Sequence, residues 1–97
     1  MTHYVAIVEE EPGKAVGVWF PDLPGCFSAG DTVEEAMLNA GEAIALWAEA
    51  DDEKDARPMP HPRTVAELRA DPETAADLDR YLLALIPFEG PLAAAAE

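Results

Sequence analysis

Hydrophobic alternation near the N-terminus predicts a β-hairpin. Residues 3–9 and residues 15–20 are both rich in β-branched and aromatic side chains. Gly13 lies in the polar stretch between them and supplies turn chemistry. The second run alternates between two faces of different bulk, with Val16, Val18 and Phe20 on one face and Ala15, Gly17 and Trp19 on the other.

A proline-rich turn interrupts this pattern. Residues 21–25 read Pro-Asp-Leu-Pro-Gly, and the two prolines end the strand because they donate no backbone hydrogen bond. Pro24 and Gly25 suit the central positions of a type II turn, whose second central residue takes a positive φ. We therefore expect the chain to reverse here into a short third strand over residues 26–29.

Helical spacing begins after Gly30. Thr32 and Glu35 stand three positions apart, which is the spacing of a capping box at a helix start. One face of the following segment is apolar and carries Val33, Ala36, Met37, Ala40, Ala43, Ile44 and Trp47. The opposite face carries Glu35, Glu42 and Glu49. We expect this helix to pack its apolar, alanine-rich face on the sheet and to expose its acidic face.

An exposed connector and two short helices are predicted next. Residues 49–55 are strongly acidic, and prolines at alternate positions over residues 58–62 prevent a helix. The capping-box spacing of Thr64 and Glu67 predicts a short helix over residues 65–70. A further helix is predicted with Asp71 as its N-cap and Pro72 at its first position, ending near Asp79.

The last apolar run covers residues 81–87 and ends at a proline. It is typical of a strand buried on both faces, although periodicity alone leaves a helix possible. A buried strand after a crossover helix implies a parallel neighbour. Residues 89–97 show no pairing pattern and are expected to form a loose tail, so residues 1–88 are the predicted domain.

Composition and charge then narrow the function classes. The 97 residues are 49% hydrophobic, which suits one globular domain. A net charge of -14 repels the phosphates of DNA and RNA and attracts a basic partner. No apolar stretch approaches the roughly 20 residues of a membrane-crossing helix. A single cysteine and no secretory leader favour a cytoplasmic protein.

Candidate catalytic chemistry is weak in this sequence. Cys26 would need His3 or His61 as a base to act as a nucleophile, and a free cysteine more often behaves as a small buried hydrophobe. Glu9, Asp22 and Asp31 stand at strand ends, where they suit solvation, turn stabilisation and the helix start better than a metal site. The sequence therefore predicts no catalytic residue, metal or cofactor.

Residues 20–36, Phe-Pro-Asp-Leu-Pro-Gly-Cys-Phe-Ser-Ala-Gly-Asp-Thr-Val-Glu-Glu-Ala, carry a specific family pattern. With the preceding strands, the alanine-rich helix and the late run ending Ile86-Pro87, the chain resembles the HicB-like antitoxin family over residues 4–88. The resemblance implies an α+β fold of truncated ribonuclease-H type, without nuclease residues. It has a three-stranded antiparallel meander, a crossover helix and a fourth strand parallel to the first.

The resemblance also implies a function. Members of the family bind a small basic HicA-like toxin, which cleaves messenger RNA, and mask its active site. Contacts are expected at the proline turn and the acidic helix, namely at Trp19, Pro21, Asp22, Pro24, Gly25, Asp31, Glu35 and Glu42. Many members also carry a C-terminal DNA-binding segment, which the residues after Pro87 do not resemble, so no direct DNA binding is expected.

Two other readings remain open from the sequence. The antitoxin is itself expected to be a homo-oligomer, a dimer or a tetramer. The first alternative is an orphan oligomeric module that has no toxin partner and uses a sheet edge or the Trp19 face for self-association or ligand binding. A hydrolase dependent on Cys26 is the third reading.

Overall fold

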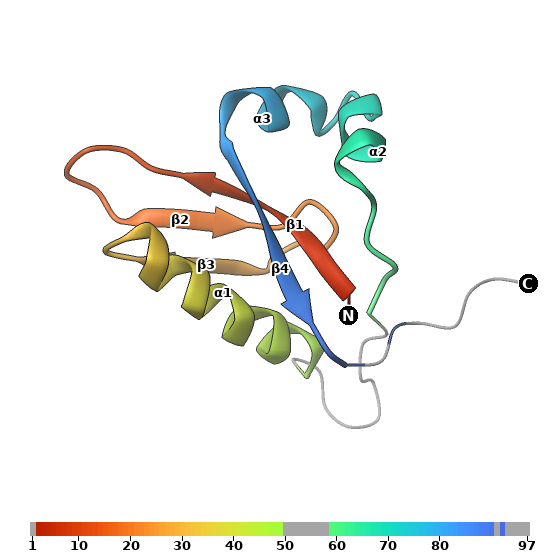
Figure 1. Ribbon diagram of the computed structural model, residues 1–97, viewed down its shortest axis with the longest axis horizontal. Coiled ribbons are helices and arrows are strands. Elements are labelled where there is room, and N and C mark those ends of the chain that lie inside the picture. The colour runs from red at the N-terminus through yellow and green to blue at the C-terminus, as the bar shows by residue number, and fades with distance from the viewer. Residues whose placement is uncertain (1, 50–58, 91, 93–97) are drawn as a thin grey trace, which may run out of the picture.

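The computed structural model describes residues 2–49, 59–90 and 92, and its fold is α+β (Figure 1). Four strands form one sheet in the order β3-β2-β1-β4. The strands are β1 (Thr2–Glu9), β2 (Val16–Trp19), β3 (Phe27–Gly30) and β4 (Leu82–Phe88). The helices are α1 (Val33–Ala48), α2 (Val65–Ala70) and α3 (Ala75–Arg80). The predicted fold class is confirmed, and the bounds of β1, β2, β3 and α2 lie within one residue of the sequence predictions.

The first three strands form the predicted antiparallel meander. In the β1–β2 hairpin Ile7 lies opposite Trp19, and in the β2–β3 pair Trp19 lies opposite Phe27. The two faces of β2 also separate as predicted, since Val16 and Val18 are buried while Trp19 is half-buried on the other side. The alternation of side-chain size along residues 15–20 therefore predicts the orientation of this strand.

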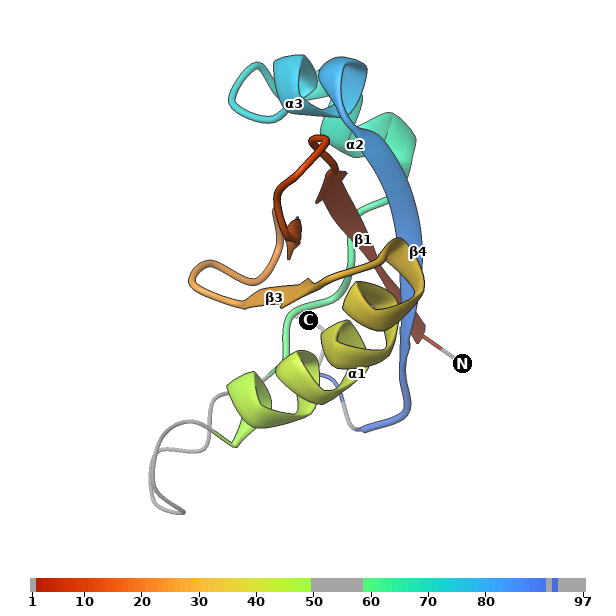
Figure 2. The ribbon, with the colours of Figure 1, turned by 90° about the vertical axis from the view of Figure 1, so that its left-hand side faces the viewer.

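Helices cover the sheet on both faces, as Figure 2 shows with α1 on one side and α2 and α3 on the other. Residues 4–8 of β1 are consequently buried without interruption. On one face, alternate residues of β1 from Tyr4 to Val8 pack against the α1 residues Ala36, Ala40 and Ile44. On the other face, Val5 and Ile7 pack against Leu68 of α2 and Leu78 of α3. The small alanines of α1 allow the helix to approach the sheet closely, as predicted.

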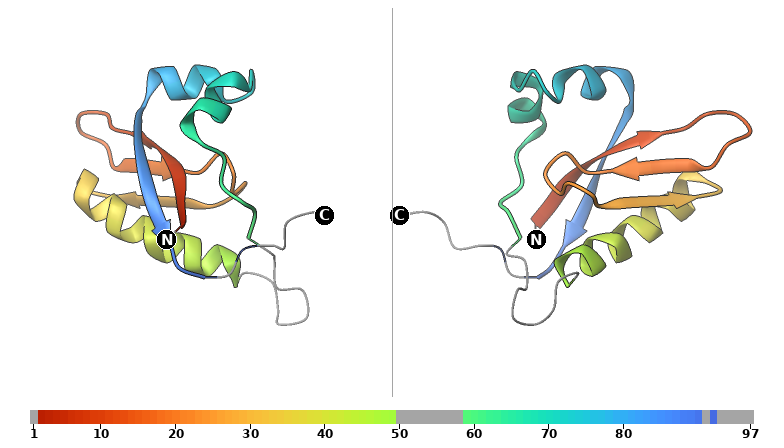
Figure 3. Two further views of the ribbon diagram at one scale, coloured as in Figure 1. Left: turned by 45° about the vertical axis from the view of Figure 1, so that its right-hand side comes forward. Right: turned by 180° about the vertical axis from the view of Figure 1, so that it is seen from behind.

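The direction of β4 corrects the sequence prediction. β4 pairs antiparallel with β1, from Val8 opposite Leu82 to Thr2 opposite Phe88, so the predicted parallel fourth strand is wrong. A single crossover helix would return the chain parallel to β1. Here residues 59–64 carry the chain back along the sheet to α2 and α3 before β4 starts, and β4 therefore runs the opposite way (Figures 1 and 3).

The burial of β4 also differs from the prediction. β4 is an edge strand in which Ile86 is buried, whereas Leu82 is 57% and Leu85 59% exposed. The prediction of a strand buried on both faces is wrong because the helices cover the centre of the sheet and leave this edge open. Pro87 fits such a position, since proline lacks a ladder donor and is found on edge strands.

The start of α1 uses its predicted N-cap. The backbone N–H of Glu35 donates to Oγ1 of Thr32 at 3.0 Å. The carboxylate of Glu35 accepts from the N–H of Asp31 at 3.3 Å, one residue earlier than in a standard capping box. Gly30 is required immediately before this start, because a Cβ there would lie 2.6 Å from the backbone nitrogen of Ala36.

The two short helices begin differently from each other. α2 has the complete predicted capping box between Thr64 and Glu67. α3 begins at Ala75, so the predicted start at Pro72 is wrong. The carboxylate of Asp71 accepts from the N–H of Glu73 at 2.8 Å, and this local bond holds residues 71–74 as a turn that precedes the helix.

Two predicted segments fall largely outside the described residues. The structure describes only residue 49 of the acidic connector over residues 49–55. Of the tail over residues 89–97, it describes residues 89, 90 and 92. The loose tail and the domain boundary at residue 88 therefore stay predictions. Leu92 is described, and it pairs with Met59 in an isolated parallel bridge. Within the described part of the chain, no helix is long and apolar enough to span a membrane.

Candidate partner-binding surface

The proline turn that precedes β3 consists of two successive hydrogen-bonded turns. The N–H of Leu23 donates to the carbonyl of Phe20 at 3.1 Å, and the N–H of Cys26 donates to the carbonyl of Leu23 at 3.0 Å. Gly25 has a φ of 84°, as the predicted type II turn requires. Leu23 is fully buried and anchors the turn in the core, whereas Pro24 and Gly25 are exposed.

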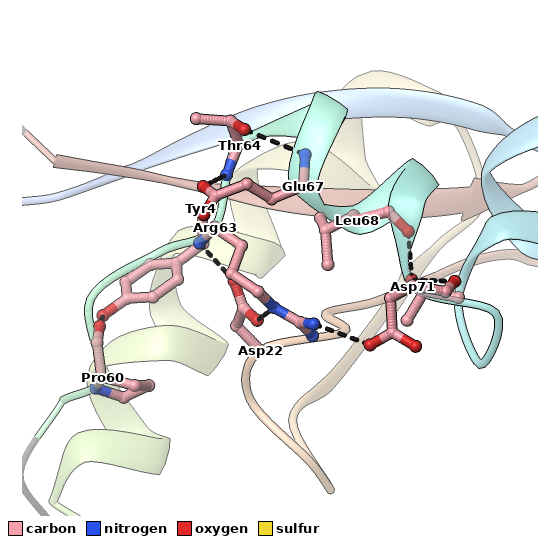
Figure 4. Close-up of polar contacts among 9 residues, drawn as sticks. Tyr4, Asp22, Pro60, Arg63, Thr64, Glu67, Leu68 and Asp71 are labelled. Atoms are coloured by element: carbon pink, nitrogen blue, oxygen red, sulfur yellow. Dashed lines mark hydrogen bonds and ion pairs between the residues drawn. The ribbon is translucent and has the colours of Figure 1, made fainter.

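Asp22 is engaged inside the molecule by an ion-pair cluster that Figure 4 shows. Its two carboxylate oxygens accept from the backbone N–H and from Nε of Arg63, both at 2.7 Å. Nη1 of Arg63 donates to the carboxylate of Asp71 at 2.8 Å. Arg63 therefore joins the proline turn to the segment between α2 and α3, and we call Asp22, Arg63 and Asp71 the arginine clamp.

The arginine clamp shifts the pKa values of two of its members. The hydrogen bond to Asp22, followed by that to Asp71, raises the pKa of Arg63 above its already high value. The pKa of Asp71 is lowered, first by the N–H of Glu73 and then by the guanidinium of Arg63. Arg63 and Asp71 thus stay charged at neutral pH, and the clamp is an internal fastening.

Further bonds attach the turn and the connector to the core. Nε1 of Trp47, near the end of α1, donates to the carbonyl of Pro24 at 2.9 Å. The hydroxyl of Tyr4 donates to the carbonyl of Pro60. Burial, with a smaller effect from the Asp22 carboxylate, raises the pKa of Tyr4, so this phenol stays protonated and keeps its donor.

α1 runs back along β3 and forms one continuous surface with it. Nδ2 of Asn39 donates to the carbonyl of Ala29 at 2.8 Å, and Oγ of Ser28 donates to the carbonyl of Ala36 at 3.0 Å. Glu35 and Glu42 stand four and three positions from Asn39, so they lie on the same flank of α1, beside β3. Both glutamates are exposed, as is Asp31 at the start of the helix.

Exposed apolar side chains also lie at this edge: Leu46 is on α1, and Phe27 faces the other side of the sheet, because it lies opposite Trp19. Phe27 on β3 is 70% exposed, and Leu46, on the same flank of α1 as Glu42, is 67% exposed. We call this region the β3 surface and define it by Pro24, Gly25, Phe27, Asp31, Glu35, Glu42 and Leu46. Carboxylates and exposed apolar side chains at one edge of a sheet suit a protein-binding site.

The structure divides the contact residues predicted from the sequence. Pro24, Gly25 and the three acidic residues of the β3 surface are exposed. Asp22 is held by Arg63, and its side chain is 9% exposed. Trp19 is half-buried on the other face of the sheet, where its ring meets the ring of Tyr81 edge-on with centroids 5.2 Å apart. Pro21 is half-buried at the base of the turn.

The alternative chemistries find little support in the geometry. Cys26 is 3% exposed, and burial raises its pKa to about 11, so the thiol is protonated at neutral pH and is a poor nucleophile. His3 and His61, the candidate bases, are exposed. Among the described residues, no group of three or more acidic, histidine or cysteine side chains is placed to hold a metal ion.

Comparisons with known proteins identify the family. A family model described as HicB_like antitoxin of bacterial toxin-antitoxin system matches residues 4–87. This chain belongs to that family. The resemblance drawn from the proline turn and the helix start is thereby confirmed.

Solved HicB structures share the fold. The crystal structure of the Burkholderia pseudomallei antitoxin HicB is 29% identical, with a TM-score of 0.73, over 100% of this chain and 75% of that one. A chain in a HicA3 and HicB3 toxin-antitoxin complex is 26% identical, with a TM-score of 0.68, over 92% of this chain and 100% of that one.

A phage protein is similar in sequence. The 14.9 kDa protein of the rep-hol intergenic region of Haemophilus phage HP1 (strain HP1c1) is 51% identical over 57 residues. The match covers 56% of this HicB-like chain and 41% of the phage protein. This HicB-like chain therefore matches less than half of that relative.

Sequence reasoning missed several residues of the site. Arg63 gave no signal of its role, because its partner Asp22 lies 41 positions away. Phe27 carried a weak signal, since in a four-residue strand alternation does not show whether Cys26 or Phe27 faces the core. Leu46 lies outside the apolar stripe of α1, and that departure from the helical pattern was the available sign of an exposed leucine.

Proposed function

We propose that this chain is a non-enzymatic antitoxin that binds a small basic HicA-like toxin ribonuclease and masks its active site. Family membership supports the antitoxin role, and a similar chain occurs in a toxin-antitoxin complex. The observation that carries the proposal is the β3 surface, where the exposed carboxylates of Asp31, Glu35 and Glu42 border β3 and Phe27 is exposed on the other face of that strand.

The chemistry of the β3 surface matches that of an RNA-cleaving toxin. A protein that holds RNA presents cationic side chains, and a chain of net charge -14 attracts them over a distance of several ångströms. Phe27, Leu46 and Pro24 supply apolar area for the centre of the contact, while the carboxylates pair at its rim. The double turn and the arginine clamp hold Pro24 and Gly25 in place, which limits the entropy lost on binding.

Each residue predicted from the sequence has a place in this proposal. Asp31, Glu35 and Glu42 are rim contacts, and Pro24 and Gly25 are direct contacts at one end. Asp22 acts through Arg63 as a positioning residue for the turn. Trp19 and Pro21 border the turn from within the fold and are expected to contribute through packing.

A growth-rescue assay tests the function. Expression of a HicA-like toxin arrests bacterial growth, and co-expression of this chain is expected to restore it. The double variant Phe27→Lys/Glu42→Lys should lose the rescue and should weaken binding to a catalytically inactive toxin by at least about tenfold in calorimetry. Added salt should weaken wild-type binding, because the rim contacts are ionic.

The matched control is Leu85→Lys/Glu73→Lys. It makes the same kinds of substitution at exposed residues away from the β3 surface and should keep the rescue. Equal loss in both double variants, or in neither, would contradict the proposed surface. RNA or ester hydrolysis by the purified chain that Cys26→Ala abolishes would contradict the non-enzymatic role.

One observation favours the alternative of an oligomeric module. The leucines of β4 are exposed along a sheet edge that has no strand beside it in the described part of the chain. This feature lies on the other edge of the sheet from the β3 surface. Exposed leucines at the β4 edge are therefore compatible with toxin binding at the β3 surface.

A further inference from the structure

Two rows of side chains cross the face of the sheet that lies away from α1. The first row, taken from β1 to β3, consists of Ile7, Trp19 and Phe27. The second row, two residues away along each strand, consists of Glu9, Gly17 and Ala29. α2 and α3 lie over the β1 and β4 part of this face and away from β3 (Figures 1 and 2). Phe27 and Ala29 of β3 are accordingly exposed.

Aromatic rings extend the first row toward α3. We call Tyr81, Trp19 and Phe27 the aromatic row, because the Tyr81 ring meets the Trp19 ring edge-on and Trp19 lies opposite Phe27. At the Tyr81 end, the guanidinium of Arg80 lies over the ring, 5.3 Å from its centroid. At the other end, Phe27 is 70% exposed. The aromatic row thus already holds one guanidinium of this chain and offers an exposed ring on which a second can stack.

The second row is a floor of small residues that ends at a carboxylate. Gly17 has no side chain, and a Cβ there would meet nothing within 4 Å. A hollow of about 300 Å³ opens beside it, lined by Glu9, Glu11, Lys14, Ala15 and Gly17. Glu11 pairs with Lys14 at 3.0 Å. Glu9 is therefore the carboxylate of this hollow that a new cation can approach without displacing Lys14.

We infer that this open part of the sheet face is a slot for one arginine side chain of the partner protein. We call Glu9, Gly17, Trp19 and Phe27 the arginine slot. Gly17 lies opposite Glu9, two residues from Trp19 and diagonal to Phe27, so a flat group above Gly17 is within reach of all three side chains. The guanidinium stacks against the two rings and pairs with the Glu9 carboxylate.

The inference rests on the proposed function, because the basic toxin is the source of this arginine. β3 is the outermost strand and has four residues, so a single strand separates the arginine slot from the carboxylates of Asp31, Glu35 and Glu42. A toxin bound to these carboxylates reaches the arginine slot by extending one side chain around the β3 edge. Phe27, on the far face of β3, then contacts the same partner as the acidic flank of α1.

Shape and charge select an arginine over other occupants. A guanidinium is flat and weakly hydrated, so it stacks on an aromatic ring, whereas the ammonium of lysine is compact and strongly hydrated. A phosphate or carboxylate would meet the charge of Glu9 and the net charge of -14. A second copy of this chain is a poor source of cations, because it has 6 basic side chains against 20 acidic ones.

The arginine slot is tested first without the toxin. Nα-acetylarginine amide is titrated into the isotope-labelled full chain and followed by NMR. The corresponding citrulline amide, in which a neutral urea group replaces the guanidinium, is the matched control. The arginine probe should shift the amide signals of Gly17, Phe27 and Ala29 and the indole signal of Trp19 more than citrulline does. Glu9→Gln should remove this difference.

Toxin affinity tests the arginine slot in the complex. Gly17→Leu fills the floor and should weaken binding to a catalytically inactive HicA-like toxin by at least about tenfold in calorimetry. Gly41→Leu is the matched control, because its Cβ also meets nothing within 4 Å but lies on α1, away from the arginine slot. Gly41→Leu should bind as the wild type does. Thermal melts of both variants confirm that each is folded.

The aromatic contribution is separated from simple apolar contact at Phe27. Phe27→Tyr retains a ring and should keep the wild-type affinity for the toxin. Phe27→Leu retains apolar area without a ring and should lose roughly fivefold in affinity. Equal affinities of these two variants would overturn the stacking of a guanidinium on Phe27.

The outcomes distinguish the arginine slot from the proposed function. Equal shifts with the arginine and citrulline probes, or wild-type toxin affinity in folded Gly17→Leu, would overturn the arginine slot while toxin binding at the β3 surface stands. A wild type that binds no HicA-like toxin but still prefers arginine to citrulline would overturn the proposed function and the toxin as the source of the arginine. The slot itself would then be supported by the probe alone.

Discussion

The two edges of this sheet show how one small domain can offer two surfaces of different chemistry. The β3 edge is short, is tied to α1 by Asn39 and is surrounded by carboxylates. The β4 edge is longer, has no described neighbour and is bordered by leucines and an apolar groove. The two edges therefore differ in charge, in exposed apolar area and in the backbone groups left unpaired.

α1 creates this difference, because it serves both edges at once. One of its flanks carries Glu35, Asn39 and Glu42 beside β3, and the other carries Glu34, Leu38 and Gly41 beside β4. Its buried stripe, through Ala36, Ala40 and Ile44, fixes both flanks relative to the sheet. Changes at the junction between α1 and the strands should therefore separate the two edges experimentally.

The largest effect is expected at Gly30, where β3 meets α1. Gly30→Ala places a Cβ 2.6 Å from the backbone nitrogen of Ala36, and the backbone must shift to accept it. We expect the free energy of unfolding to fall by roughly 2–3 kcal/mol in urea denaturation. The control Gly41→Ala, on the β4 side, meets nothing within 4 Å and should stabilise the chain by up to about 1 kcal/mol. Equal effects would mean that β3 and α1 are less tightly joined than described.

The arginine clamp should give the next largest effect. Asp22→Ala removes two acceptors of Arg63 and should lower the free energy of unfolding by about 2 kcal/mol. Asp22→Asn retains one carbonyl acceptor and should cost less. Because the clamp holds the proline turn at the end of the β3 surface, Asp22→Ala should also weaken toxin binding. Toxin binding equal to that of the wild type would contradict the positioning role of Asp22.

Acidification should weaken the fastening around α2. The pKa values of Asp71 and Glu67 are lowered in the folded state, Asp71 mainly by the N–H of Glu73 and Glu67 mainly by the N-cap residue Thr64. The unfolded state therefore binds protons first as pH falls. Their contribution is fully present above the ordinary carboxyl pKa and is lost as pH falls through the lower folded values. Thermal melts should show this loss below about pH 4, and Asp71→Asn should reduce the dependence on pH.

The smallest effect concerns the tie between Asn39 and the β3 edge. Asn39→Asp replaces a donor by a carboxylate that cannot bond to the carbonyl of Ala29, while helix propensity changes little. We expect a loss of about 1 kcal/mol and faster amide exchange in β3. β4 amides should exchange as in the wild type. Slower exchange in β3 would indicate that the freed edge has found another strand.

Local sequence signals predicted most of the elements because their causes are local. The type II turn requires Gly25 at a positive φ, and the two N-caps require Thr32 and Thr64. The alternation of large and small residues along β2 also predicts which face of this strand points to the core. In each case the residue that decides the structure lies within a few positions of the structure it decides.

The direction and the exposure of β4 could not be predicted from local sequence signals. An apolar run such as residues 81–87 looks the same in a central strand and in an edge strand whose leucines remain exposed. Its direction depends on where residues 59–64 and the two short helices take the chain, and no local pattern encodes that path. The partnership of Asp22 with Arg63 is equally non-local, which is why no local pattern indicated that the Asp22 carboxylate is bound inside the molecule.

Each face of the sheet carries one tryptophan at the margin of its hydrophobic cluster. Trp47 lies on the α1 side, bonded to the proline turn, and Trp19 lies on the α2 and α3 side, against Tyr81. The chain contains no other tryptophan. Replacing either one by phenylalanine would leave a single tryptophan, so tryptophan emission, excited apart from the two tyrosines, can report the loosening of each layer separately, without an added dye.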